Sequence, residues 1–297
     1  MEKTKDYGGS AEAIRYHYDV SREFYALWLD ESMTYSAALW DEQSMDSDSL
    51  AQAQRRKLRF HLQQARAERA SRLLDVGCGW GGLMREAGDL AGVKEIVGLT
   101  LSEDQAAFVR GMNDPKFEIR LENWVDHRPT RPYDSIVSIG AFEHFAKPQD
   151  SIAEKIKVYR DFFCSCHSWL QPHGRMSLQT IAYGSMRREE ASEFINTEIF
   201  PAADLPTLAE IASAAEGVME IAAVANHRLH YAKTFETWAA NLKKNRSKAI
   251  ALVGEETTSR YERYLRQSSI GFYMGKIALL RLSLRPILGN WRQMAVL

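Results

Sequence analysis

The strongest constraint on the fold of this chain is an apolar segment that runs directly into a glycine-rich turn. Leu73–Val76 has the composition of a buried strand, and glycines follow at positions 77, 79, 81 and 82, before a helical pattern begins. Because glycine has no Cβ, such a turn lets the backbone approach a ligand closely. The segment therefore predicts an α/β fold with a ligand bound at the carboxyl end of this strand.

The glycine spacing alone leaves two classes of ligand open. Gly77, Gly79 and Gly82 satisfy the GxGxxG pattern of dinucleotide enzymes. The next predicted strand, however, ends in Thr100, where a dinucleotide enzyme would carry an acidic residue on the ribose. Asp75 lies two residues before the first glycine, where its carboxylate can orient the loop or accept from a ligand amine. This combination favours S-adenosylmethionine over NAD, while a purely structural turn remains the alternative.

Strand-like and helix-like segments alternate along most of the chain, which is typical of a mostly parallel α/β sheet connected by helices. A further hairpin strand near Val218–Val224 predicts one antiparallel strand at the end of the sheet. Ser102 and Gln105 predict a capping box at the start of the helix that follows the second strand. The other predicted strands are Arg72–Val76, Glu95–Leu99, Phe117–Leu121, Ser135–Ile139 and Arg175–Ile181. The longer predicted helices are Ala11–Asp30, Ser49–Ala70, Asp150–Leu170, Thr234–Leu252 and Thr258–Leu282.

Composition narrows the class of protein further. The chain has 297 residues, 45% of them hydrophobic, which suffices for a full core, and a net charge of −1 gives no field that would attract nucleic acid. Three cysteines, no visible metal-ligand cluster and no long apolar run predict a soluble, cytoplasmic protein without a metal site. Residues 241–297 carry eleven Lys or Arg against three acidic residues. These charges fit solvated helix faces, or contact with an acyl carrier or a membrane surface.

Seven short motifs occur in an order that matches a known family. The chain resembles the cyclopropane-fatty-acid synthases, a family of S-adenosylmethionine-dependent methyltransferases, and within it the mycolic acid cyclopropane synthases. The resemblance covers nearly the whole chain and implies a class I methyltransferase sheet of Rossmann-like type. The motifs are Tyr16–Asp19, Met33–Ser36, Asp75–Gly81, Gly98–Ser102 with Gln105, Ser138–Phe145, Thr197–Pro201 and His230–Thr234.

The resemblance also implies a domain organisation and a set of donor-binding residues. Residues 1–70 would form a helical segment that closes over the donor site. Residues 71–297 would form the methyltransferase core, with added helices over the acceptor pocket and a basic C-terminal helix. By resemblance, Tyr35 and Ser36 contact the methionine part of the donor, Gly77 and Gly79 line its amino acid, Thr100 and Gln105 hold the ribose, and Trp124 covers the adenine.

The family is understood to hold a bicarbonate ion that removes a proton after methyl transfer to an alkene. The resemblance places Glu143 and Tyr231 on this ion, with Ile139 as a backbone contact. Two of the usual contacts are changed, because Ala37 and Gln179 stand where the family has cysteine and histidine. Three outcomes are open. Bicarbonate stays on Glu143, Gln179 and Tyr231, or Glu143 is itself the base, or the acceptor requires no such proton removal.

These observations predict a C-methyltransferase that transfers a methyl group to an olefinic carbon through a carbocation, with or without cyclopropane formation. Its acceptor would be an unsaturated lipid, an isoprenoid or a natural-product intermediate. The alternatives are N-methylation of a small amine, a non-catalytic donor-binding protein and a dinucleotide enzyme. His144 and His167 are interpreted as structural, with His144 pointing away from Glu143. The sequence does not fix the oligomeric state.

Overall fold

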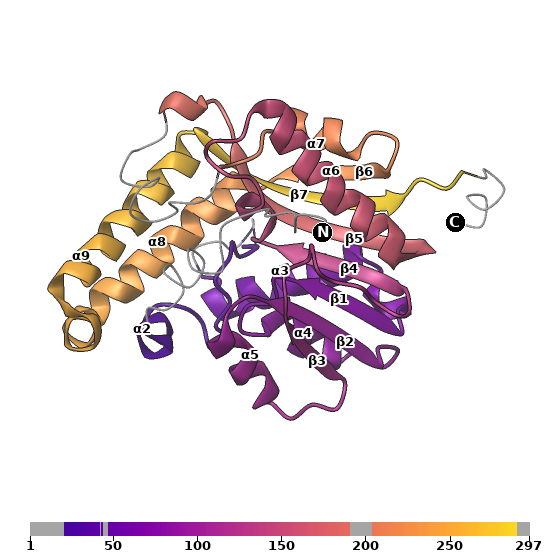
Figure 1. The fold of residues 1–297 in the computed structure, drawn as a ribbon. Coiled ribbons are helices and arrows are strands. Elements are labelled where there is room, and N and C mark those ends of the chain that lie inside the picture. Colours follow the sequence, from indigo (N-terminus) through magenta and orange to yellow (C-terminus); the bar gives the residue numbers. More distant parts are fainter. Residues whose placement is uncertain (1–20, 42, 44–46, 191–203, 290–297) are drawn as a thin grey trace, which may run out of the picture.

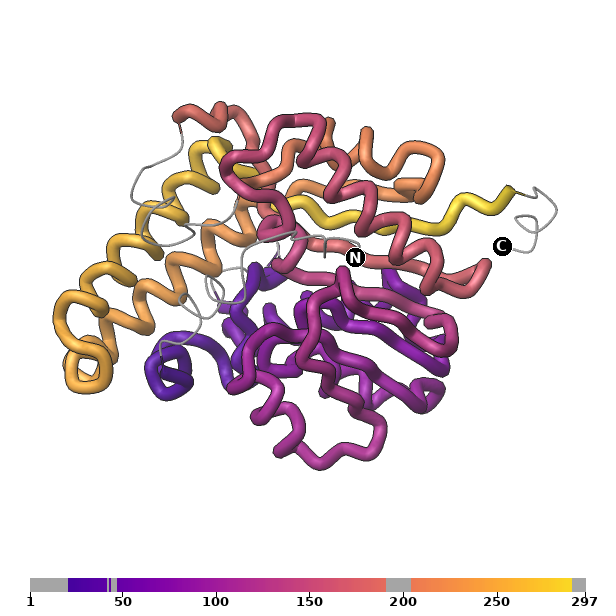
Figure 2. Tube along the Cα trace, viewed as in Figure 1, coloured from indigo at the N-terminus to yellow at the C-terminus, as the bar shows by residue number. Residues whose placement is uncertain are grey.

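The core of the protein is a single seven-stranded sheet with the strand order β3-β2-β1-β4-β5-β7-β6. The computed structural model describes residues 21–41, 43, 47–190 and 204–289. Strands β1 to β5 pair in parallel, whereas β7 is antiparallel to both β5 and β6. Figures 1 and 2 show the sheet at the centre, with helices on both of its faces. This topology confirms the mostly parallel α/β sheet that the sequence predicts.

The predicted strands form, and four of them, β2, β4, β5 and β6, extend beyond a predicted end. The largest difference is in the fifth strand, which was predicted as Arg175–Ile181. Strand β5 begins five residues earlier, at Leu170, and ends two residues later, at Tyr183. The strands are β1 (Arg72–Val76), β2 (Glu95–Thr100), β3 (Phe117–Leu121), β4 (Tyr133–Ile139), β5 (Leu170–Tyr183), β6 (Met219–Asn226) and β7 (Ile277–Pro286).

Side chains alternate between two hydrophobic cores on opposite faces of the sheet. Leu73 belongs to a core with α3 (Leu50–Gln64), α4 (Gly82–Gly88) and α5 (Glu103–Arg110), whereas its neighbour Leu74 packs in the core that includes α6 (Ile152–Trp169) and α7 (Leu208–Ala215). Successive strand residues point to opposite faces, so an apolar run buries both of them. Three short 3₁₀ segments complete the connections: Ala67–Arg69, Phe142–His144 and Arg188–Glu190.

A third core consists largely of aromatic side chains and lies beside the sheet. It joins α2 (Arg22–Ala26) to two long helices, α8 (Arg228–Lys244) and α9 (Arg246–Tyr273). Figure 1 shows α8 and α9 side by side, extending away from the strands. Among the helices in the described ranges, none combines the length and the apolar composition that crossing a bilayer would require.

The predicted C-terminal helix Thr258–Leu282 is wrong in its second half. Helix α9 ends at Tyr273, Gly275 takes a positive φ of 68°, and the chain turns into strand β7. The apolar run of this strand does not distinguish helix from strand, and only its place between β5 and β6 settles its conformation. The boundary between the predicted helices Thr234–Leu252 and Thr258–Leu282 also differs from the boundary between α8 and α9. Helix α8 already ends at Lys244, although Gly254 is non-helical within α9.

The predicted capping box at Ser102 is half correct. Ser102 accepts from the backbone N–H of Gln105, as expected for an N-cap. The Gln105 side chain does not return to Ser102, because its Oε1 accepts from the Thr100 hydroxyl at 2.7 Å. Complete capping boxes occur instead at Ser49, Ser151 and Thr207.

Some sequence predictions fall outside the described residues. The motifs Tyr16–Asp19 and Thr197–Pro201 both lie there, as does the first half of the predicted helix Ala11–Asp30. Within the described part of that helix, only Arg22–Ala26 is helical. The division of the chain into residues 1–70 and 71–297 stays a prediction.

A buried ion-pair cluster fixes α6 against the segment that leads into α7. The ammonium group of Lys155 lies 2.8 Å from Asp204 and 3.3 Å from Glu210, and it donates to the carbonyl of Leu205. The side chains of Lys155 and Asp204 are each only 3% exposed. Removing Lys155 would leave Glu210 without this cation and Asp204 with only Arg188, whose Nε lies 3.3 Å from its Oδ2.

We therefore expect Lys155→Met to lower the free energy of unfolding by about 3 kcal/mol. The matched control is Lys157→Met on the same helix, since Lys157 pairs with Asp161 at 2.8 Å but its side chain is 59% exposed. That exposed pair is worth about 0.5 kcal/mol or less. Urea denaturation of both variants measures the difference, and equal losses would contradict this account.

Candidate active site

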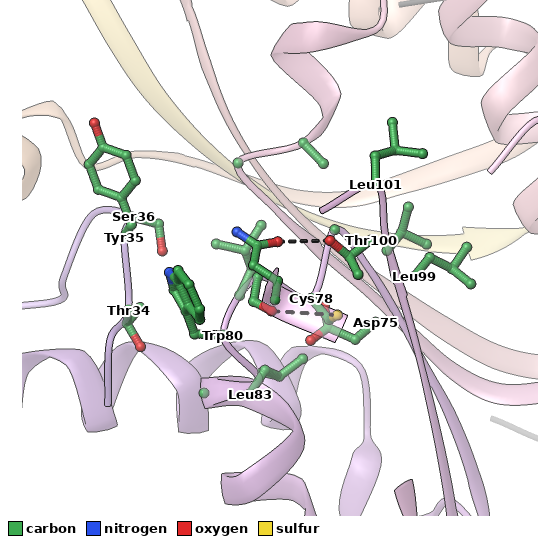
Figure 3. A pocket seen from close by; sticks show the side chains of 18 of the residues that line it. Thr34, Tyr35, Ser36, Asp75, Cys78, Trp80, Leu83, Leu99, Thr100 and Leu101 are labelled. Carbon is green, nitrogen blue, oxygen red and sulfur yellow. Dashed lines mark hydrogen bonds between the residues drawn. The ribbon is translucent and has the colours of Figure 1, made fainter. Parts of the chain in front are cut away.

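A cavity of about 170 Å³ opens at the carboxyl ends of β1, β2 and β4. All eight residues predicted to bind the donor line it: Tyr35, Ser36, Asp75, Gly77, Gly79, Thr100, Gln105 and Trp124. In Figure 3, Tyr35 and Ser36 lie on one side of this donor cavity, and Asp75 and Thr100 lie on the other. The structure therefore brings together residues that are up to 89 positions apart in the sequence.

The glycine turn that forms the floor of the donor cavity requires glycine at its first position. Gly77 has a φ of 82°, and a Cβ placed there would lie 2.7 Å from the Cβ of Ala141. The backbone N–H groups of Gly77 and Cys78 both donate to the carbonyl of Leu99. Any L side chain at position 77 would thus be strained and would also collide with the neighbouring strand end.

Asp75 faces the donor cavity with a polar atom that lacks a partner. Its side chain is buried, and Oδ2 has no hydrogen bond within the part of the chain that the structure describes. Burial raises the pKa of Asp75 to about 7, and the positive charge of Lys57 only partly opposes this shift. A ligand ammonium group beside Asp75 would satisfy the orphaned oxygen and favour the ionised form.

The residues predicted to contact the ribose and the adenine line the cavity and also have roles within the protein. The Thr100 hydroxyl donates to Gln105, so the two polar groups are already aligned at the cavity wall. Trp124 packs edge-on against Phe162 and tilted against Phe145, within the hydrophobic core. Trp124 is therefore both a core residue and a wall of the donor cavity.

Tyr35 is held by the aromatic core between α2, α8 and α9. Its ring lies 5.3 Å from that of Trp28 and 5.4 Å from that of Trp238, measured between centroids. Its hydroxyl donates to that of Tyr264 at 3.2 Å. The aromatic helices thus fix one wall of the donor cavity in place.

Helix α3 contributes a buried polar stripe that the sequence analysis missed. Gln54 donates to the carbonyls of Thr34 and Ser36, and Lys57 donates to the Ser36 hydroxyl at 2.9 Å. The third member of the stripe, His61, lies farther along the same face. These polar residues are three and then four positions apart, so they lie on the same buried face of α3 as Leu58 and Leu62. The helical periodicity of the sequence could have revealed this arrangement.

A second cavity, of about 360 Å³, adjoins the first and has a largely apolar lining. The two cavities share Tyr35, Ser36, Gly140 and His144. Of the predicted catalytic residues, Glu143, Gln179 and Tyr231 line this acceptor cavity, whereas Ile139 lines the donor cavity. The apolar part of the lining comes mainly from Ile181, Leu205, Phe235, Ile270, Phe272, Met274, Ile277 and Leu279.

Glu143 is the most perturbed acid of the acceptor cavity. It is 5% exposed, accepts from the Thr180 hydroxyl at 3.0 Å, and receives a longer contact of 3.5 Å from the backbone N–H of Ile181. Burial raises the pKa of Glu143 to about 7, and these hydrogen bonds only partly offset the effect. A carboxyl group with this pKa is suited to exchanging a proton near neutral pH.

Gln179 is oriented by a buried arginine from the neighbouring strand. Arg281 Nε donates to Gln179 Oε1 at 2.8 Å, and Arg281 Nη2 donates to the carbonyls of Ala37 and Ala38. Since a guanidinium only donates, the atom that it contacts is the amide oxygen, which leaves the NH₂ group of Gln179 for other partners. Arg281 therefore contacts both positions, 37 and 179, at which this chain departs from the family that it resembles.

The guanidinium of Arg281 is a buried cation. It is 2% exposed, and burial lowers its pKa to about 9. No carboxylate of the described residues lies within 4.0 Å of it. Its remaining hydrogen bond joins Nη1 to Nδ1 of His227. Charge of this kind polarises the Gln179 amide and favours an anion nearby.

The two histidines that were interpreted as structural, His144 and His167, lie in different surroundings. His144 lines both cavities, and its predicted orientation away from Glu143 stays a prediction. Burial lowers the pKa of His144 to about 4, so it is neutral at physiological pH. His167 lies on α6, where its Nε2 is 3.1 Å from the carbonyl of Ile287, consistent with a structural role.

The raised pKa of Glu143 predicts how the free energy of unfolding depends on pH. Folding favours the protonated form, so Glu143 lowers stability progressively as pH rises from about 4.5 to about 7. Glu143→Gln mimics the protonated form and should raise the free energy of unfolding by about 3 kcal/mol at pH 8. Below pH 4.5 the variant and the wild type should have equal stability. Chemical denaturation at both pH values tests this, and a destabilised variant at pH 8 would contradict it.

The fold and the paired cavities define a class I methyltransferase. The features of this class are a seven-stranded sheet with an antiparallel β7, a glycine turn after β1 and a cavity at the strand ends.

The comparisons with known proteins identify the family within this class. Residues 5–282 match the family model described as mycolic acid cyclopropane synthetase. The chain therefore belongs to the mycolic acid cyclopropane synthetase family and is an S-adenosylmethionine-dependent methyltransferase.

Individual relatives agree with this assignment. Cyclopropane mycolic acid synthase 2 of Mycobacterium bovis is 38% identical over 282 residues, which cover 87% of this chain and 89% of that protein. A probable fatty acid methyltransferase of Pseudomonas putida is 36% identical over 293 residues, covering 93% and 70% of the two chains. The solved structure of cyclopropane synthase MmaA2 from Mycobacterium tuberculosis superposes with a TM-score of 0.82 at 33% identity, covering 95% of this chain and 100% of that one. The mycolic acid cyclopropane synthase CmaA1, complexed with SAH and CTAB, gives the same TM-score and identity and covers 94% and 99%.

Proposed function

We propose that this enzyme transfers a methyl group from S-adenosylmethionine to a carbon–carbon double bond in an unsaturated lipid chain. The observation that carries this proposal is the acceptor cavity, which is apolar, joins the donor cavity, and contains a buried carboxyl group at Glu143. The lipid character of the acceptor is supported by relatives named for mycolic acid and fatty acid substrates. The exposed apolar side chains Ile270 and Met274 at the cavity lining suit the entry of an acyl chain.

The donor supplies an electrophilic methyl group on a positively charged sulfur. The protein aligns the alkene with it and excludes water, since an alkene is a weak nucleophile and the resulting carbocation would react with water. Tyr35, Tyr231 and Phe235 present aromatic rings in the acceptor cavity, where their faces can stabilise a positive charge. The Tyr231 and Phe235 rings are stacked, with centroids 4.5 Å apart.

Glu143, Gln179 and Tyr231 form the proposed deprotonation site, with Ile139 at its donor side. We propose that they retain a bicarbonate ion despite Ala37 and Gln179. The support is the buried cation of Arg281, which polarises the Gln179 amide and restores positive charge where the family has histidine. Glu143 in its carboxylate form would accept a hydrogen bond from the bicarbonate hydroxyl, and a bicarbonate held there would supply the base for a proton of the added methyl group. Delivery of the lipid by an acyl carrier or from a membrane surface through residues 241–297 stays a prediction.

Some of the basic residues of 241–297 form ion pairs within the protein or are buried in it. Arg246 pairs with Glu255 and Glu262, Arg285 forms a two-contact pair with Glu220, and Arg281 is buried. These contacts reduce the charge that residues 241–297 can offer to a carrier or a membrane.

The acceptor class is tested by transfer of a labelled methyl group. We expect label in unsaturated phospholipids or unsaturated acyl chains, and none in the saturated chains of equal length, because only the double bond can accept the methyl cation. Small amines are included as the competing acceptors. Labelling of amines with no labelling of any alkene would overturn the proposed function.

The role of Glu143 is tested by turnover and by donor binding together. Glu143→Gln should lose at least about 100-fold in kcat, the scale of an acid–base contribution, with unchanged S-adenosylhomocysteine affinity. Wild-type kcat should rise as pH increases through about 7, where Glu143 loses its proton. Turnover that is unaffected in the variant would remove Glu143 from the mechanism.

The bicarbonate proposal has its own measurement. Turnover should fall in carbon-dioxide-depleted buffer and recover when bicarbonate is added. Arg281→Met should raise the bicarbonate concentration needed for half-maximal turnover by about tenfold, because the Gln179 amide loses the charge that polarises it. Turnover independent of bicarbonate in the wild type would show that Glu143 or another group accepts the proton directly.

A further inference from the structure

The buried lysine of helix α3 has one hydrogen bond and no adjacent counter-ion. Lys57 is 0% exposed, and its ammonium group donates to Ser36 Oγ at 2.9 Å. Throughout the described ranges of the chain, no carboxylate lies within 4.0 Å of it. An ammonium group is costly to bury without a paired charge, and an ammonium offers three donors. Two of the three have no hydrogen bond to a described residue.

The position of Lys57 relates this deficit to the donor cavity. Lys57 and Ser36 both line that cavity, and so does the carboxylate of Asp75. Burial lowers the pKa of Lys57 to about 7, and Arg281 adds to the effect, while Asp30 and Asp75 oppose it. Asp30 is already used by the backbone N–H groups of Ser32 and Thr34. The cavity thus has a cationic group and an anionic group on its wall, each short of a partner.

A purely structural role does not account for Lys57. Holding the segment 34–36 against α3 is already done by Gln54, whose amide donates to the carbonyls of Thr34 and Ser36. An apolar residue at position 57 would pack in the same place without the desolvation cost. A charged residue there becomes favourable when an anion enters the cavity.

We propose that Lys57 is a donor-binding residue whose ammonium group, together with the Ser36 hydroxyl, receives the α-carboxylate of S-adenosylmethionine. Asp75, with its orphaned Oδ2, receives the α-ammonium group of the same molecule. The two buried charges of the protein are thus matched to the two charges of the amino-acid part of the donor. This inference concerns the donor alone and holds whatever the acceptor is.

Calorimetry with two ligands tests this assignment without relying on turnover. One ligand is S-adenosylhomocysteine, and the other is its decarboxylated analogue, which keeps the amine and the nucleoside. The wild type should prefer S-adenosylhomocysteine by about 100-fold, the scale of a buried charge-assisted contact. Lys57→Met should reduce this preference to about threefold or less, by weakening S-adenosylhomocysteine binding and leaving the analogue nearly unaffected.

Two controls keep the result decisive. Ser36→Ala retains the charge and should lose only about tenfold of the preference. The wild-type measurement stands even where Lys57→Met fails to fold, because equal wild-type affinities for the two ligands overturn the proposal. A Lys57→Met variant that weakens both ligands equally would also overturn it, since a structural defect has that signature. The acceptor assay is separate, so failure of the proposed function leaves this inference intact.

Discussion

Removal of ionisable groups from water in and around two adjoining cavities is the constraint on which this structure depends. Asp75, Glu143, Lys57 and Arg281 are each 5% exposed or less, and burial is the first cause of the pKa shift in all four. Such charges are costly in an empty protein and become favourable when ligand charges compensate them. The site therefore suits a zwitterionic donor and, in our proposal, a small anion whose charge would compensate that of Arg281.

The scaffold that holds these groups combines local turns with long-range packing. The glycine turn after β1 shapes the donor cavity, and α3 attaches the segment with Tyr35 and Ser36 to the sheet. Helices α8 and α9 then supply aromatic walls to the acceptor cavity. Methylation of an alkene, as we propose it, requires that water be excluded from the site. Because packing does this rather than a single residue, the aromatic core would contribute to the reaction.

Features of the fold that depend on neighbouring residues could be predicted from local sequence patterns. The glycine turn, strands β1 and β3 and the set of residues around the donor cavity follow from apolar runs, glycine positions and family motifs. Strand β7 was missed because its apolar run also fits the end of a helix, and only the sheet decides between the two. With β7 in place, the register puts Arg281 directly opposite Gln179. Lys57 was missed although its spacing from Gln54 and His61 places it on the buried face of α3, because a lysine in a helix is usually assigned to the solvent-exposed face.

The central claim is that the added methyl group loses a proton inside the acceptor cavity. The most direct measurement is mass spectrometry of the lipid product formed from S-adenosylmethionine with a fully deuterated methyl group. The account predicts that the product carries two deuterium atoms on the new carbon, because the third leaves as a deuteron at the site of Glu143. Retention of all three deuterium atoms would contradict it.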